Sequence, residues 1–168
     1  MNALRHPLIV ESPTAAGPLV WRSEAETRQF AQRLAACPAL RNAFVQLHGE
    51  LGAGKTTLVR HLLLALGVQG RIKSPTYTVV EPYELPELAI WHFDFYRFAD
   101  PREWEDAGFR DIFASPGLKL AEWPQKAAAY LPQADLEVHI GVAQDETRSV
   151  CLLAHTAVGQ ALLRDTSP

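Results

Sequence analysis

The chemistry of this chain is concentrated in residues Gly49 to Thr57, which read G-E-L-G-A-G-K-T-T. They contain the pattern G-x-x-x-x-G-K-[ST], in which backbone N–H groups of a glycine-rich loop surround a polyphosphate. Lys55 adds a positive charge beside the phosphates, and the Thr56 hydroxyl can bind Mg²⁺. The pattern predicts a nucleotide site whose phosphate contacts are Gly49, Glu50, Leu51, Gly52, Ala53, Gly54, Lys55, Thr56 and Thr57.

Two acidic residues, Asp94 and Glu122, each follow an apolar stretch and are expected at the rim of a sheet. Ligands of open α/β sheets gather beyond the carboxyl ends of the strands. Mg²⁺ prefers oxygen ligands, so the candidate protein groups are Thr56, Asp94 and Glu122. Asp94 can alternatively order the attacking water, or simply cap the turn that follows its strand.

Two weaker patterns accompany these residues. Ser74-Pro75-Thr76 follows the glycine loop at the place where many nucleotide hydrolases position a hydroxyl that senses the γ-phosphate, although S-P-T is also an ordinary turn. His92 and Asp94 share one face of a strand and could ligate a metal, but no further nitrogen or sulfur ligand for zinc is evident nearby.

The loop must be held between a strand and a helix, and the sequence contains both. Residues 43–47 (AFVQL) form a short apolar run typical of a buried strand. Leu58, Leu62 and Leu66 follow at helical spacing, and Gly67 is placed to end that helix. The helix N-terminus directs about half a positive charge at the bound phosphates.

Elsewhere, strands and helices alternate at first and then give way to hairpins. We expect a strand at 19–21, a helix capped by Ser23 and running to about 36, a hairpin of strands 79–83 and 89–96, short helices from 101 and at 109–113, strands at 118–121, 136–142 and 148–153, and a helix at 158–163. This order predicts an α/β fold with three layers and a central sheet of mixed parallel and antiparallel strands.

Composition indicates a single domain. The 168 residues, of which 48% are hydrophobic, suffice for one core, which we place in residues 19–168. Residues 1–18 contain three prolines and little periodicity, and are expected to be a flexible arm. No apolar stretch approaches the roughly 18 residues of a membrane span, and the two cysteines show no disulfide or metal spacing, so we expect no membrane association and a cytoplasmic location.

Several nucleotide-binding and nucleic-acid-binding classes are excluded or unsupported. The 16 basic and 19 acidic residues are scattered, so no electrostatic footprint for nucleic acid is visible. Neither asparagine precedes a lysine, so the guanine-reading N-K-x-D motif is absent. The dinucleotide fingerprint also fails, because Thr57 stands where Gly or Ala is needed. An adenine nucleotide is the expected ligand.

Four motifs in this order resemble the TsaE (YjeE) family over about residues 20–155. They are H-G-E-L-G-A-G-K-T-T (48–57), K-S-P-T-Y-T-V-V-E-P-Y (73–83), H-F-D-F-Y-R (92–97) and E-W-P (122–124). The resemblance implies a P-loop ATPase required for N6-threonylcarbamoyladenosine modification of tRNA. It implies ATP and Mg²⁺ as ligands, TsaD and TsaB as partner proteins, and contact with tRNA only through that complex.

The resemblance also assigns roles to individual residues. Lys55 would hold the β- and γ-phosphates, Thr56 and Glu122 would bind Mg²⁺, Asp94 would support hydrolysis, and Thr76 would belong to a switch-like loop. Trp123 would lie beside the nucleotide or a partner surface. The residues expected near the adenine are Ser23, Glu24 and Thr27.

Two other functions remain open on the sequence. A small-molecule P-loop kinase would use Arg97, Arg102 and Arg110 as a lid, although no acceptor pocket can be identified. A nucleotide-gated binding module would use ATP only to stabilise a partner-binding shape. No arginine can be assigned to the γ-phosphate, which favours an ATPase that depends on its partners, since a supplied arginine can raise kcat by about 10³ to 10⁵.

Overall fold

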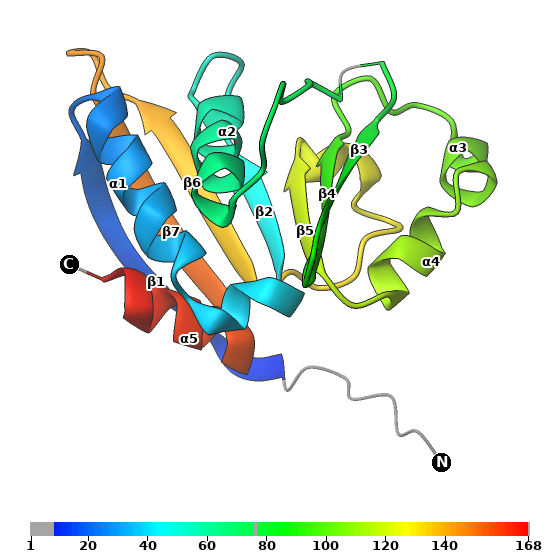
Figure 1. Ribbon diagram of the computed structural model, residues 1–168. Helices are drawn as coiled ribbons and strands as arrows, with labels where there is room; N and C mark the ends of the chain where they lie inside the picture. The colour runs from blue at the N-terminus through cyan, green and yellow to red at the C-terminus, as the bar shows by residue number, and fades with distance from the viewer. Residues whose placement is uncertain (1–8, 76, 168) are drawn as a thin grey trace.

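The structure, a computed structural model, describes residues 9–75 and 77–167 (Figure 1). Within these ranges, one mixed sheet of seven strands has the order β1-β7-β6-β2-β5-β4-β3. Its strands are β1 (Ile9–Trp21), β2 (Phe44–His48), β3 (Val80–Leu85), β4 (Leu88–Asp94), β5 (Leu118–Glu122), β6 (Leu136–Val142) and β7 (Arg148–Thr156). The expected α/β fold with a mixed sheet is confirmed.

The parallel strands lie at the centre of the sheet. β2 pairs in parallel with both β5 and β6, and β4 pairs in parallel with β5. β3 is joined to β4 as an antiparallel hairpin, as predicted, and β6, β7 and β1 complete the other side in antiparallel pairs. The carboxyl ends of β2, β4 and β5 therefore meet at one edge of the sheet.

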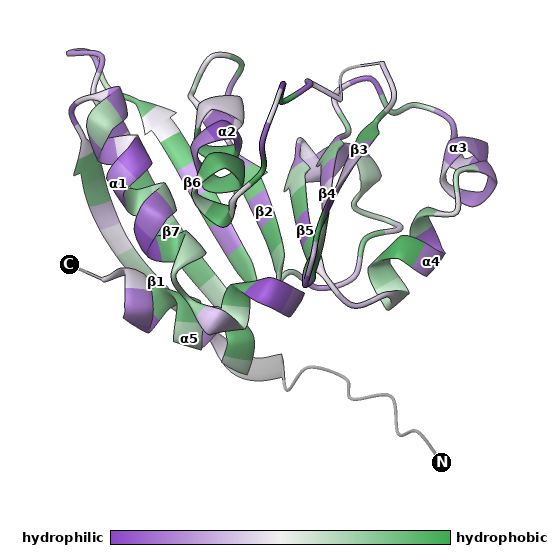
Figure 2. Cartoon of the chain, in the orientation of Figure 1, coloured by the Kyte–Doolittle hydropathy of each residue, from purple (hydrophilic) through white to green (hydrophobic). Residues whose placement is uncertain are grey.

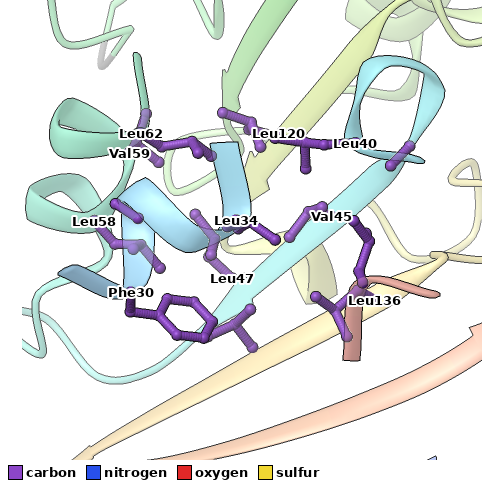
Figure 3. Close-up of a cluster of buried hydrophobic side chains, with 14 of the residues drawn as sticks. Phe30, Leu34, Leu40, Val45, Leu47, Leu58, Val59, Leu62, Leu120 and Leu136 are labelled. Carbon is purple, nitrogen blue, oxygen red and sulfur yellow. The ribbon is translucent and has the colours of Figure 1, made fainter. Parts of the chain in front are cut away.

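Helices cover both faces of the sheet. They are α1 (Glu24–Ala35), α2 (Lys55–Leu66), α3 (Pro101–Asp106), α4 (Phe109–Ala114) and α5 (Ala157–Thr166), with 3₁₀ turns η1 (Pro38–Asn42) and η2 (Pro124–Ala127). α1, α2 and α5 pack on the larger hydrophobic cluster, where Phe30 and Leu34 of α1 meet Val45 and Leu47 of β2 (Figure 3). In Figure 2, hydrophilic and hydrophobic bands alternate along α1, as expected for a helix with one face in the core.

A second, aromatic cluster occupies the opposite face. Ile90 and Phe93 of β4 are three positions apart, so their side chains point to opposite faces of the sheet. Ile90 packs in the larger cluster, and Phe93 packs in the aromatic one. There its ring contacts those of Phe95 and of Phe109 on α4, and Phe109 in turn contacts Trp104 on α3. Two cores on opposite faces make the three layers that the sequence predicted.

The first strand is longer than predicted. β1 begins at Ile9 rather than at residue 19, and it pairs along β7. Pro13 and Pro18 fall in the two register irregularities of this pairing, and β1 is an edge strand, where a missing N–H is tolerated. The prolines were the reason to expect a flexible arm over residues 1–18. Residues 9–18 instead belong to a strand, with which prolines at these positions are compatible. Residues 1–8 lie outside the described residues.

A buried carboxylate joins the core strands to the last helix. The Phe44 N–H donates to Asp135 Oδ2 at 2.7 Å, and the Thr156 hydroxyl donates to Asp135 Oδ1 at 2.6 Å. Thr156 also caps α5, since its Oγ1 accepts a hydrogen bond from the Gly159 N–H. Asp135 and Thr156 are buried, so these bonds hold β2, β6 and α5 together away from the ligand edge.

Candidate nucleotide-binding site

The glycine loop connects β2 to α2 at the edge where the parallel strands end. α2 begins at Lys55, and Gly54 before it has φ of 111°, in the left-handed region that glycine tolerates best. A Cβ on Gly49 would lie 2.6 Å from the Ile140 carbonyl oxygen of β6. The loop can therefore pass this close to β6 only with glycine at position 49.

Lys55 is buried inside this loop. Its Nζ donates to the carbonyls of Gly49 and of Glu50, the second at 3.0 Å, and lies 4.3 Å from the ring centroid of Trp123. Burial lowers the pKa of Lys55, and neighbouring acidic side chains offset part of this effect. Trp123 has φ of 54°, a strained conformation for this residue type, and this conformation brings its ring over the lysine.

A chain of three side chains links α2, β5 and β4. The Thr56 hydroxyl donates to Glu122 Oε1 at 2.8 Å, and His92 Nε2 is 2.6 Å from Glu122 Oε2. His92 and Glu122 are both buried, and His92 Nδ1 has no hydrogen-bond partner. A proton on Nδ1 would be buried without an acceptor, so we assign the tautomer in which Nε2–H donates to Glu122.

Asp94 lies beside Glu122 in the parallel register of β4 and β5. Its Oδ1 accepts a hydrogen bond from the Tyr96 N–H at 3.0 Å. Asp94 therefore caps the turn that follows its strand, which was one of the roles considered for it from the sequence. Burial, together with the negative charge of Glu122, raises the pKa of Asp94. A carboxylate with a raised pKa next to a hydroxyl and a second carboxylate can accept a proton or hold a hydrated cation.

These groups line one cavity of about 340 Å³. Its lining consists of Leu51, Gly52, Gly54, Lys55, Thr56, Thr57, Ser74, Asp94, Tyr96, Arg97, Glu122 and Trp123. The structure thus brings together both predicted acidic residues, Trp123 and part of the predicted loop, whereas Gly49, Glu50 and Ala53 do not line this cavity. The oxygen donors of Thr56, Glu122 and Asp94 fit a hard cation such as Mg²⁺. Thr76, also predicted here, lies outside the described residues.

A second cavity of about 210 Å³ shares Gly54 and Thr57 with the first. Its lining consists of Trp21, Arg22, Ser23, Glu24, Thr27, Ala53, Gly54, Thr57, Glu146 and Arg148. The three residues expected near the adenine are therefore close to the loop and outside the first cavity.

Sequence reasoning missed one residue of this region, Arg148, and for His92 it missed the contact with Glu122. Arg148 Nε donates to the Ala53 carbonyl at 2.8 Å across 95 positions of sequence, and no local pattern signals such a contact. His92, in contrast, had a usable signal, because strand alternation put it on the same face as Asp94.

A family described as "Threonylcarbamoyl adenosine biosynthesis protein TsaE" matches residues 21–150. This chain belongs to the TsaE family. Among curated relatives, the tRNA threonylcarbamoyladenosine biosynthesis protein TsaE of Haemophilus influenzae is 43% identical over 136 residues, covering 81% of this chain and 85% of the relative. The Bacillus subtilis protein of the same description is 36% identical over 143 residues, covering 84% and 87%.

One solved structure is similar to this chain over most of its length. The crystal structure of Bacillus subtilis YdiB superposes with a TM-score of 0.72 at 27% identity, covering 92% of this chain and 93% of that one. The family resemblance seen in the sequence is confirmed, and with it a role in threonylcarbamoyladenosine modification of tRNA. In the described part of this TsaE family member, no helix has the length and apolar character that crossing a membrane requires.

Proposed function

We propose that this TsaE family member is a P-loop ATPase that binds and hydrolyses Mg²⁺-ATP to drive threonylcarbamoyladenosine modification of tRNA. The observation that carries the proposal is the contact of Thr56 with Glu122, 2.8 Å long, in a cavity that Lys55 and Asp94 also line. A hydroxyl, two carboxylates and an ammonium group around one space are suited to a nucleotide polyphosphate and its cation.

The loop backbone and Lys55 would bind the phosphates. Lys55 now donates to the carbonyls of Gly49 and Glu50, so its ammonium group lies within the loop and can turn from these neutral acceptors to phosphate oxygens. Thr56 and Glu122 would hold Mg²⁺, which neutralises charge on the β- and γ-phosphate oxygens when bound. The smaller cavity beside Ser23, Glu24 and Thr27 would accept the adenine.

Asp94 would orient the attacking water and accept its proton. It is adjacent to Glu122 on the sheet and lines the phosphate cavity, and its raised pKa makes it a stronger base than an ordinary aspartate. Arg97 lines the same cavity, with its guanidinium carbon 5.2 Å from the Tyr77 ring centroid.

Full turnover would depend on TsaD and TsaB, with tRNA contacted only through their complex.

Hydrolysis assays with the purified chain test this proposal. We expect Mg²⁺-dependent ATP binding by the chain alone, slow phosphate release, and a strong rate increase when TsaD and TsaB are added. Asp94→Ala should retain ATP binding and complex formation but lose both hydrolysis and tRNA modification. Asp165→Ala is the matched control, because Asp165 is an exposed carboxylate on α5 that pairs with Arg164 and lines neither cavity.

Three results would contradict the proposal. Full-rate hydrolysis by the chain alone, unchanged by TsaD and TsaB, would remove the partner dependence. A phosphorylated metabolite in place of free phosphate would favour the kinase. Normal tRNA modification by Asp94→Ala would favour the nucleotide-gated binding module, since modification would then proceed without hydrolysis.

A further inference from the structure

A second polar cluster lies on the opposite sheet face from α1, α2 and α5. The even-numbered residues of β2 and the odd-numbered residues of β6 and β7 face away from the larger hydrophobic cluster. This alternation places His48 at the end of β2, Glu137 and His139 on β6, and His155 on β7 together on one surface. His48 and His139 are direct register partners across the β2–β6 pair.

Three imidazole rings converge on one carboxylate in this cluster. His48 Nε2 is 3.1 Å and His139 Nε2 is 3.5 Å from Glu137 Oε1. His155 Nε2 pairs with the other oxygen, Oε2. The rings of His48 and His139 stack with centroids 4.3 Å apart and an interplanar angle of 10°. No side chain of the nucleotide cavities belongs to this group.

The spacing of these atoms is that of a small tetrahedral metal centre, which the cluster would form once one of the two stacked rings turns, because imidazole lone pairs lie in the ring plane and two parallel rings cannot both direct them at one ion. The ligating atoms of His48, Glu137 and His139 all lie within 4.8 Å of one another. Metal–nitrogen and metal–oxygen bonds of roughly 2.0 to 2.2 Å put two tetrahedral ligands roughly 3.3 to 3.6 Å apart. The distance of 3.5 Å from Glu137 Oε1 to His139 Nε2 falls within this range, and the distance of 3.1 Å to His48 Nε2 is slightly shorter.

We propose that His48, Glu137 and His139 form a binding site for a divalent transition-metal ion of the Zn²⁺ type. Two imidazoles and one carboxylate are the ligand set of zinc sites with three protein ligands, in which water takes the fourth position. Imidazole nitrogen favours Zn²⁺ over Mg²⁺, which prefers oxygen. The His139 side chain is 45% exposed, so solvent reaches the site.

His155 serves as a positioning residue for this centre. By holding Glu137 Oε2 it leaves Oε1 directed at the other two histidines. A ligating carboxylate is commonly fixed in this way by a hydrogen bond to its second oxygen. Because His48 directly precedes Gly49, the ion would bind at the strand end from which the glycine loop starts.

The probe for this site is Zn²⁺ titrated into the tag-free full-length chain at neutral pH, with Co²⁺ as a spectroscopic substitute. We expect one Zn²⁺ per chain by calorimetry and, for Co²⁺, the intense visible absorption of tetrahedral coordination. His139→Ala should abolish both signals. His155→Ala should keep one ion per chain while weakening its affinity by about tenfold or more. His61→Ala is the control histidine and should bind as the unaltered chain does.

Two outcomes would overturn the proposal. Stoichiometric Zn²⁺ binding that survives His139→Ala, or that is lost in Glu122→Gln instead, would place the ion at the nucleotide cavity or at scattered surface groups. The absence of stoichiometric binding to the unaltered chain would show that Glu137 and its histidines form only a hydrogen-bond network. Circular dichroism melts of each variant establish that a lost signal does not reflect unfolding.

Discussion

The contact between His92 and Glu122 leads to a prediction that separates stability from cation binding. His92→Leu replaces the imidazole with an apolar side chain of similar size and removes the donor 2.6 Å from Glu122 Oε2. His92 and Glu122 are 1% and 2% exposed, so water cannot easily replace the lost bond. Glu122 would then keep only the Thr56 hydroxyl, on its other oxygen.

The expected magnitudes follow from this geometry. A buried hydrogen bond to a charged group contributes about 1.5 to 3 kcal/mol, so we expect the free energy of unfolding to fall by about 2 kcal/mol. Loss of a partner that orients a metal ligand typically weakens metal binding by about ten- to a hundredfold. His92→Gln should recover part of both losses, because its side-chain amide can donate from a similar position to the imidazole Nε2–H.

Urea denaturation of the nucleotide-free chain measures the first quantity, and Mg²⁺ titration of fluorescent ATP-analogue binding below the melting temperature measures the second. His61→Leu is the matched control, since its pair with the 64% exposed Glu24 should contribute no more than about 1 kcal/mol. The reasoning is refuted if His92→Leu is as stable as His61→Leu and binds Mg²⁺ with unchanged affinity.

Three further predictions concern the loop, the acidic pair and the core. The raised pKa of Asp94 means that folding favours its protonated form, a contribution present at acidic pH and lost as pH rises through that pKa. Asp94→Asn should therefore raise the melting temperature at neutral pH, and this gain should disappear toward acidic pH. The same change should lower the rate of hydrolysis by about a hundredfold or more. A difference in melting temperature that does not depend on pH would contradict this prediction. Gly49→Ala puts a methyl group 2.6 Å from the Ile140 carbonyl oxygen. It should lower the free energy of unfolding measured by urea denaturation by about 1 to 3 kcal/mol and weaken ATP binding. Unchanged ATP affinity would count against the loop geometry. Thr156→Val removes a bond to buried Asp135 and a helix cap, and should cost about 3 kcal/mol without changing hydrolysis per folded molecule, which activity assays of the folded fraction can check.

Elements with local signals were predictable from the sequence. The helix after the glycine loop begins at Lys55 and ends before Gly67, as its apolar spacing and terminal glycine indicated. Ser23 caps α1, since its side chain accepts the Glu26 N–H. Local patterns failed at β1, where prolines suggested an arm and pairing with β7 produced a strand from Ile9 instead.

The candidate site was predictable only in part. Asp94 and Glu122 could be assigned to strand ends because apolar stretches precede them, but their adjacency depends on β5 lying between β2 and β4. His92 was recognised as a neighbour of Asp94 along its strand, whereas its partner Glu122 lies 30 residues away. Arg148 carried no signal, because its contact with the loop forms only after β7 joins the sheet.

The sequence by itself determined the phosphate-binding loop, because its function depends on consecutive backbone groups and two adjacent side chains, all contained in Gly49 to Thr57. It also determined the family, since four short motifs in a set order sufficed to indicate it. Only the tertiary structure decided which side chains meet. The Thr56–Glu122–His92 chain and the three histidines around Glu137 each join three secondary-structure elements, and such contacts depend on strand order and register, which non-local packing sets.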